Sequence, residues 1–149
     1  MSQKIIVQRS KPEGFNPKVQ VAATYVHYNG RILLLQLGPL KSEAGCWGVP
    51  AGKLEANEAP ITGARRELFE ETGIHIDSDN KIQFVETLFV QKPEVDYIYH
   101  MFRVKLNEDP RIELSDEHIG YQWVNLEKAE SLKLMNGAKE ALRYYYQWM

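Results

Sequence analysis

Residues 52–74 read GKLEANEAPITGARRELFEETGI, and this stretch holds the most regular pattern in the chain. A glycine is followed by a glutamate, then by Arg-Glu, an aliphatic residue, a spacer, Glu-Glu, a second spacer, another glycine and an aliphatic residue. The residues that make up the pattern are Gly52, Glu58, Arg66, Glu67, Leu68, Glu70, Glu71, Gly73 and Ile74. So many fixed identities at one spacing indicate a specific local structure that carries chemistry.

The second half of this stretch predicts a helix. Asn57 can cap its start, Pro60 is tolerated in its first turn, and Gly73 suits its C-terminal end. The apolar face of the helix is expected to contain Ile61, Ala64 and Leu68. The helix should therefore pack on a core through this face and carry its glutamates on an adjacent stripe.

That stripe contains Glu67, Glu70 and Glu71, which stand at positions i, i+3 and i+4. Like charges one turn apart destabilise a helix by a few tenths of a kcal/mol, and acid is unfavourable near a helix C-terminus. No Lys or Arg follows one turn later to compensate. A helix with this charge pattern is expected to bind a cation, and carboxylate oxygens suit Mg²⁺ or Mn²⁺. A solvated acidic face is the alternative for an isolated Glu-Glu pair.

The complete pattern resembles the Nudix box, the motif that defines the Nudix hydrolases, and it departs from that motif at no fixed position. The resemblance implies a single α/β domain over residues 1–149, with an α/β/α sandwich around a mixed β-sheet. It also implies an enzyme that cleaves pyrophosphate bonds in nucleoside diphosphates linked to another group.

The resemblance assigns roles to the residues of the box. Glu67, Glu70, Glu71 and a backbone carbonyl near Gly52 are expected to hold the divalent metal, which bridges the substrate's phosphates and polarises the bond that breaks. Glu58 and Arg66 are expected to orient these ligands. Arg66 stands one turn before Glu70, so an ordinary surface ion pair is compatible with that role.

The general base is expected among the carboxylates. Glu67 is the first choice, and Glu117 is the alternative, because family members often supply a further carboxylate from a loop before a late strand that carries a tryptophan. Here Glu117 precedes Trp123, and Glu113 and Asp116 lie in the same acidic loop. A solvated loop is the other interpretation of these residues.

The preferred substrate is a nucleoside triphosphate, cleaved to the monophosphate and pyrophosphate. Family members mark other substrates beyond the box, with a proline for ADP-ribose and a tyrosine for diadenosine polyphosphates. Neither mark fits residues 89–92, and Pro93 lies just beyond. Hydrolysis of ADP-ribose, a nucleotide sugar or a dinucleoside polyphosphate stays open, as does a regulatory module that binds nucleotides without catalysis.

Nucleotide recognition requires an aromatic surface for the base and cations for the phosphates. At least one of Trp47, Tyr97 and Tyr99 is expected to stack on the base, and Lys53 is a candidate for phosphate binding. Tyr97 and Tyr99 would share one face of a strand. Trp47 is equally compatible with a core position.

The composition supports a small globular protein. The chain has 149 residues, 44% hydrophobic and 26% charged, with a net charge of −2 and one cysteine, Cys46. These values favour neither nucleic-acid nor membrane binding, and one cysteine allows no internal disulfide. With no long apolar run and no signal peptide, a cytoplasmic location is expected.

The chain order favours a single mixed α/β domain. Strands are expected over residues 19–28, 31–37, 81–90, 97–106 and 121–124, with a hairpin at Asn29-Gly30 and a short strand and turn within residues 47–53. A last helix is expected over residues 135–148. Its aromatic residues, Tyr144 to Tyr146 and Trp148, would pack the helix on the core, and a homodimer interface is the alternative use of these side chains.

Overall fold

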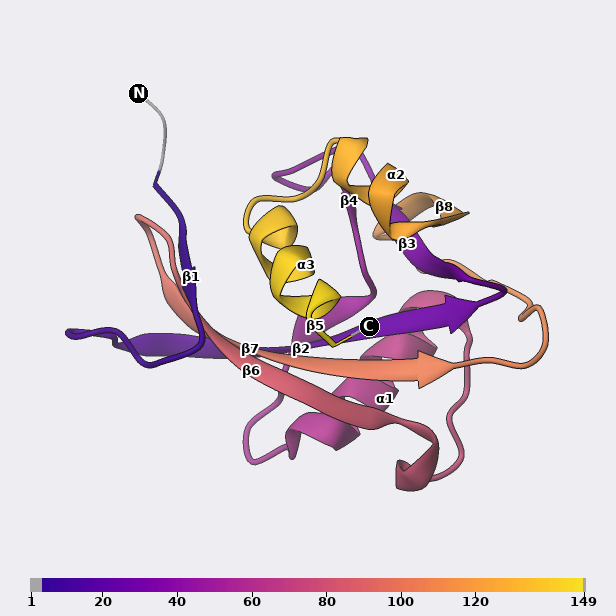
Figure 1. The fold of residues 1–149 in the computed structure, drawn as a ribbon, viewed down its shortest axis with the longest axis horizontal. Helices are drawn as coiled ribbons and strands as arrows, with labels where there is room; N and C mark the ends of the chain where they lie inside the picture. Colours follow the sequence, from indigo (N-terminus) through magenta and orange to yellow (C-terminus); the bar gives the residue numbers. More distant parts are fainter. Residues whose placement is uncertain (1–3, 149) are drawn as a thin grey trace.

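The computed structural model describes residues 4–148, so residues 1–3 and 149 of the predicted domain lie outside the described part. A mixed β-sheet forms the middle layer. Helix α1 covers one face of this sheet, and helices α2 and α3 cover the other (Figure 1). The expected α/β/α sandwich around a mixed sheet is therefore confirmed.

The sheet has eight strands in one network. They are β1 (Ile6–Gln8), β2 (Pro17–Tyr28), β3 (Arg31–Leu37), β4 (Trp47–Gly48), β5 (Ala51–Lys53), β6 (Gln83–Gln91), β7 (Asp96–Lys105) and β8 (His118–Val124). The main order is β1-β6-β7-β2-β3-β4, with β5 paired to β2 and β8 paired to β3. Among these strand pairs of residues 4–148, β2–β7 is parallel and the others are antiparallel. The helices are α1 (Pro60–Thr72), the short 3₁₀ turn η1 (Asp79–Lys81), α2 (Leu126–Ser131) and α3 (Ala138–Tyr146).

Strand β2 changes partner along its length, and this change places the site. Its middle part, Val21 to Ala23, pairs with β5, whereas it pairs with β3 only at His27 and Tyr28, next to the turn. Asn29 and Gly30 form that turn with positive φ angles, as their sequence predicts. Strands β3 and β8 therefore diverge from β2 on the side where β5 lies.

The core has two parts because the strands bury both faces. Leu33 and Leu35 point towards α1 and pack with its residues Ala64 and Leu68. The alternating residues of β3 point the other way, and this second cluster contains Ile32, Leu34, Ala129, Ala141, Leu142 and Tyr145. The uninterrupted apolar run of β3 thus serves two helix layers.

The predicted cap of α1 is wrong. The helix begins at Pro60 after Ala59, without a side-chain cap, and Asn57 lies upstream with a φ of 62°. The carboxylate of Glu58 instead accepts a hydrogen bond from the backbone N–H of Glu55 at 2.9 Å. This contact folds the preceding residues into a tight turn that delays the helix start. The C-terminal end is as predicted, with Gly73 at a φ of 78°.

The last helix begins later in the structure than the sequence predicts. The N–H of Met135 donates to the carbonyl of Trp47 at 2.9 Å, and the N–H of Trp47 donates to the carbonyl of Lys133 at 2.8 Å. These bonds hold the segment extended, so α3 starts only at Ala138. Helix α2, which the sequence reading missed, is capped by the side chain of Asn125.

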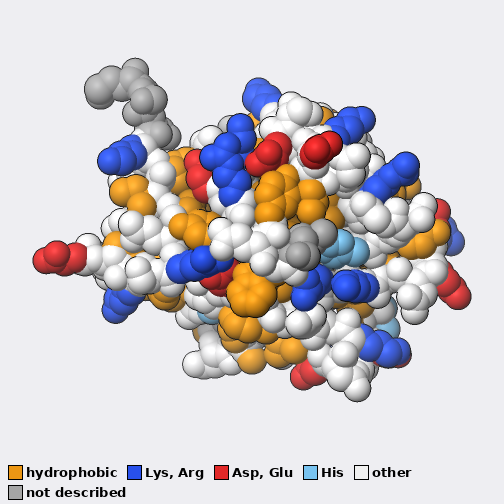
Figure 2. All heavy atoms as spheres, in the orientation of Figure 1, with side chains coloured by type: hydrophobic (Ala, Val, Ile, Leu, Met, Phe, Trp, Pro, Cys, Tyr) orange, Lys and Arg blue, Asp and Glu red, His pale blue; other side chains and the backbone are white. Residues whose placement is uncertain are grey.

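Helix α3 packs its aromatic face inwards, as one of the two interpretations required. Tyr145 is fully buried and stacks on Tyr25 with ring centroids 3.9 Å apart, while Trp148 stays 48% exposed. On the face shown in Figure 2, acidic and basic side chains are interspersed, with no area of one sign. Within residues 4–148, no helix has the length and hydrophobicity that crossing a membrane requires.

Candidate active site

The three glutamates of α1 differ strongly in exposure. Glu71 is 5% exposed, the side chain of Glu67 is 15% exposed and that of Glu70 is 54% exposed. A helix that packs on a sheet carries its i, i+3 and i+4 positions at different depths. The stripe therefore runs from a buried carboxylate at the sheet to an exposed one at the surface.

Strand β5 is tied directly to this stripe. The N–H of Ala51 donates to Glu71 Oε1 at 3.0 Å. The carboxylate of Glu67 lies on Gly52, where a Cβ atom would stand only 2.1 Å from Glu67 Cδ. Only a glycine permits this approach, so residue 52 of the pattern is explained by the volume of the Glu67 carboxylate.

Arg66 joins the other members of the pattern. Its guanidinium donates to both carboxylate oxygens of Glu58 at 2.8 and 2.9 Å, to Glu67 at 3.0 Å and to Glu70 at 3.2 Å. It also donates to the carbonyl oxygen of Lys53 at 3.1 Å. The hydrogen bonds that Arg66 donates to Glu58 lower the pKa of Glu58 to about 2. Arg66 thus fixes the glutamates relative to β5.

The loop before β8 brings a further carboxylate to the same place. Ligand atoms of Glu71, Glu117 and His118 all lie within 4.8 Å of one another. The Glu117 carboxylate accepts a hydrogen bond from Lys41 Nζ at 2.9 Å. Glu117 is therefore the member of the acidic loop that reaches the α1 glutamates, whereas Glu113 lies near Gly73 and pairs with Arg111.

Burial and the charges of neighbouring carboxylates raise the pKa of both Glu71 and Glu67. Burial raises the pKa of Glu71 to about 8, with further contributions from the charges of Glu67 and Glu117. Burial also raises the pKa of Glu67, although Arg66 opposes that shift. Burial lowers the pKa of His118, which keeps its imidazole neutral. A divalent cation would offset this repulsion, so the donor set fits a metal with oxygen ligands.

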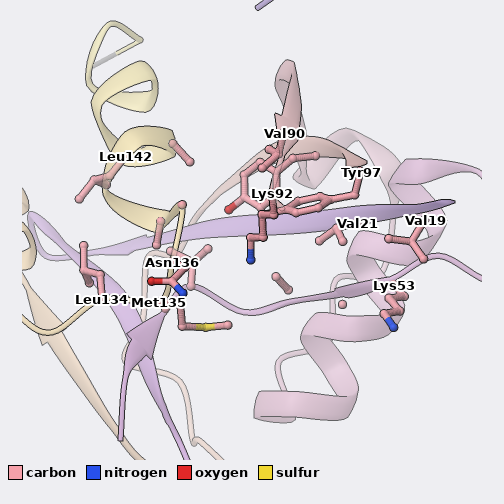
Figure 3. Close-up of a pocket in the computed structure, with 18 of the residues that line it drawn as sticks. Val19, Val21, Lys53, Val90, Lys92, Tyr97, Leu134, Met135, Asn136 and Leu142 are labelled. Carbon is pink, nitrogen blue, oxygen red and sulfur yellow. The ribbon is translucent and has the colours of Figure 1, made fainter. Parts of the chain in front are cut away.

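A cavity of about 610 Å³ opens on the other side of β5. Its walls come from β2, β5, β7, the segment before α3 and α3 itself (Figure 3). The described lining residues are mostly apolar and include no Asp or Glu. The polar groups at the cavity are Lys53, Lys92, Ser42, Asn136 and the hydroxyls of three tyrosines, Tyr25, Tyr97 and Tyr99.

The structure brings most of the predicted recognition residues to this cavity. Lys53, Tyr97 and Tyr99 line it, and Gly52 lies in the wall that it shares with the glutamates. Trp47 is not among the lining residues and packs against the core cluster beneath α2 and α3. The tryptophan is partly buried, and its contacts favour the packing role that its sequence context also allowed.

Comparison with known proteins agrees with this geometry. The family model described as NUDIX domain matches residues 18–148. The chain belongs to the Nudix hydrolase family. The Nudix box is therefore the correct interpretation of residues 52–74.

The similar proteins carry several different names. It is 32% identical over 123 residues to a phosphatase NudJ from Shigella boydii serotype 4, covering 82% of this chain and 76% of the relative. A MutT protein from Methanosarcina mazei Go1 superposes with a TM-score of 0.75 at 26% identity, covering 89% of this chain and 95% of the other. A C. elegans Ap4A hydrolase gives 0.68 at 25% identity, covering 87% and 96%.

The chain also matches two further relatives over only part of their length. It spans 37% of the first and 31% of the second.

Three polar residues beside the acidic stripe or the cavity were not singled out from the sequence. Lys92 follows β6 and extends its ammonium group towards the cavity, and Asn136 lies opposite, before α3 (Figure 3). His118 stands beside Glu117 at the start of β8. The only sequence signal for His118 is its place next to an expected carboxylate. Lys92 and Asn136 occupy loops with no motif, so only the packed fold reveals them.

Proposed function

We propose that this protein hydrolyses a pyrophosphate bond in a nucleotide, with a nucleoside triphosphate as the preferred substrate. The observation that carries the proposal is the double role of β5. One side of Ala51 and Gly52 contacts the α1 glutamates, and the other side lines the apolar cavity. A nucleoside in the cavity would therefore extend its phosphates past β5 to the acidic stripe.

The carboxylates of the site would hold the metal. Glu67, Glu70, Glu71 and the backbone at Gly52 are the proposed ligands, and a bound Mg²⁺ or Mn²⁺ would neutralise the phosphates and polarise the bond that breaks. Glu67 is the proposed general base, because its carboxylate lies on Gly52, at the wall between the glutamates and the cavity. Glu117 is the alternative base. Arg66 positions both Glu67 and Glu70 through its hydrogen bonds.

The cavity would bind the nucleoside. Tyr97 and Tyr99 offer ring surface, and Lys92 lies 5.4 Å from the centroid of Tyr97. Lys53 stands where the cavity meets the acidic stripe and would bind a phosphate. A volume of about 610 Å³ lies within the range of small-molecule sites. We therefore narrow the stacking role to Tyr97 and Tyr99.

The test is a substrate panel. Nucleoside triphosphates, ADP-ribose, nucleotide sugars and dinucleoside polyphosphates are assayed for release of pyrophosphate and phosphate, with Mg²⁺, with Mn²⁺ and with a chelator. The proposal expects pyrophosphate and a nucleoside monophosphate from a triphosphate, with activity lost in the chelator. Preferred cleavage of a dinucleoside polyphosphate would transfer the assignment to that class, which the likeness to an Ap4A hydrolase supports.

Binding of nucleotides without any turnover would replace the enzyme with the regulatory alternative. Activity in the chelator equal to that with Mg²⁺ would overturn the metal-dependent mechanism. We propose that the protein acts on small nucleotides in the cytoplasm. A homodimer is compatible with this function but is not needed for it.

A further inference from the structure

The imidazole of His118 lies beside the carboxylates of Glu71 and Glu117, and within residues 4–148 one of its ring nitrogens has no hydrogen-bond partner. His118 begins β8 and pairs with Leu37 of β3, which fixes its backbone. Within the described part of the chain, its Nδ1 atom is buried and makes no hydrogen bond. The same side chain has a ring nitrogen within 4.8 Å of carboxylate oxygens of both Glu71 and Glu117.

This arrangement is costly for a histidine that only fills space. A buried polar atom without a partner costs about 1–3 kcal/mol, and most such atoms in folded proteins are paired. The other described histidines at β2 and β7 follow the rule, since His27 bonds to Tyr145, and His100 bonds to Thr87 and Gln20. The unpaired Nδ1 therefore needs a separate explanation, and a cation bound by this imidazole together with the neighbouring carboxylates supplies one.

We propose that His118 supplies a nitrogen ligand to a divalent cation that Glu71 and Glu117 also bind, so that this site favours Mn²⁺, Co²⁺ or Zn²⁺ over Mg²⁺. Imidazole nitrogen suits these transition metals, whereas Mg²⁺ is bound mainly through oxygen. The inference rests on the proposed function only in using the same acidic site, and metal binding is measured without a substrate.

Lys41 is the group that opposes cation binding at Glu117. Its Nζ lies 2.9 Å from Glu117 Oε1, and the two side chains are 42% and 49% exposed. Exposed ion pairs of this kind contribute about 0–1 kcal/mol. The pair can therefore open at little cost, and Glu117 is available to the cation together with His118.

The first experiment compares metal affinities in the whole chain. Mg²⁺ and Co²⁺ binding are measured by calorimetry for the wild type and for His118→Asn, with His75→Asn as the matched control. Asparagine places an amide oxygen near the position of Nδ1, so the variant exchanges nitrogen for oxygen. The expected result is a Co²⁺ affinity about 10-fold lower or more, with Mg²⁺ affinity changed less than about threefold. His75 is exposed beyond α1, so its variant should match the wild type.

The second experiment needs no variant. Pulsed electron paramagnetic resonance of Mn²⁺ bound to the wild type should detect modulation from a coordinated imidazole nitrogen. Absence of that modulation, or an equal loss of Co²⁺ and Mg²⁺ affinity in a folded His118→Asn protein, would overturn the proposal. Failure of every substrate in the panel with intact nitrogen modulation would instead overturn the proposed function and leave this metal site standing.

Discussion

The two sides of β5 are built in opposite ways. On one side lies the acidic stripe, whose residues and the nearby Glu58 all come from residues 58–71. The hydrogen bonds of Arg66 hold Glu58, Glu67 and Glu70 in place. On the other side, the cavity takes its lining from Val19 to Leu142, mostly apolar and without acid among the described residues. One side is short in sequence and rigid in bonding, whereas the other is assembled from most of the chain.

This difference separates chemistry from recognition. The acidic stripe leaves no room for a change of shape, because Glu67 lies on Gly52 and Glu71 is bonded to Ala51. The cavity has a volume of about 610 Å³ and is lined mostly by apolar residues. Changes on the acidic side should therefore reduce kcat, and changes in the cavity should raise KM.

The largest effect is expected from Glu67→Gln. Loss of the proposed general base should lower kcat by about 10²–10⁴-fold in steady-state assays, while the fold survives because like-charge repulsion is removed. Glu108→Gln, in an exposed turn, is the matched control and should retain wild-type rates. If Glu117→Gln loses far more activity than Glu67→Gln with metal affinity unchanged, the roles of the two glutamates are reversed.

Gly52→Ala tests whether the acidic side is as rigid as its contacts imply. The added Cβ would displace the Glu67 carboxylate, and a displacement of that kind is expected to lower kcat by about 10²-fold. Gly120→Ala is the control, because its Cβ would stand 3.4 Å from the nearest atom. Equal rates for Gly52→Ala and the wild type would show that Glu67 can move without loss.

A cavity change should act on KM. Tyr97→Ala is expected to weaken substrate binding by about 1–3 kcal/mol, with KM raised more than kcat is lowered. Tyr121→Ala, on exposed β8, is the control and should leave KM unchanged. A wild-type KM for both Tyr97→Ala and Tyr99→Ala would place base recognition elsewhere in the molecule.

Trp47→Ala separates packing from recognition. Because Trp47 packs against the core beneath α2 and α3, its loss should lower the unfolding free energy in urea denaturation by roughly 1–3 kcal/mol while KM stays near the wild-type value. A raised KM in a variant of unchanged stability would return Trp47 to the recognition surface.

The smallest effect concerns the Glu58–Arg66 pair and its pH dependence. The folded pKa of Glu58 is about 2, below its ordinary value of 4.5, so its stabilising contribution is present above 4.5 and is lost as the pH falls towards 2. Glu58→Gln should reduce the unfolding free energy by about 1–2 kcal/mol at pH 7, and the difference should shrink between pH 5 and pH 2. Urea denaturation across this range measures it, with Glu113→Gln in an exposed pair as the control. A difference that does not vary with pH would show that the charge of Glu58 is not responsible.

Much of the fold was predictable because it depends on local repetition. The apolar run of β3, the Asn29-Gly30 turn and the Gly73 helix end appear where the sequence predicts them. The errors at Asn57 and Met135 share one cause. In both places a hydrogen bond outside the expected helix, to Glu58 or to Trp47, holds the backbone in another conformation.

The sequence by itself determined the family and the spacing of the α1 glutamates, because separations within a helix follow from its 3.6-residue period. The tertiary structure alone decided that Glu117 and His118 reach Glu71, that Lys92 and Asn136 border one cavity, and that Trp47 packs against the core. Those positions depend on the register of β8 against β3 and on the packing of α3 over the sheet. Such long-range contacts arise only when the whole chain has closed, so no local pattern encodes them.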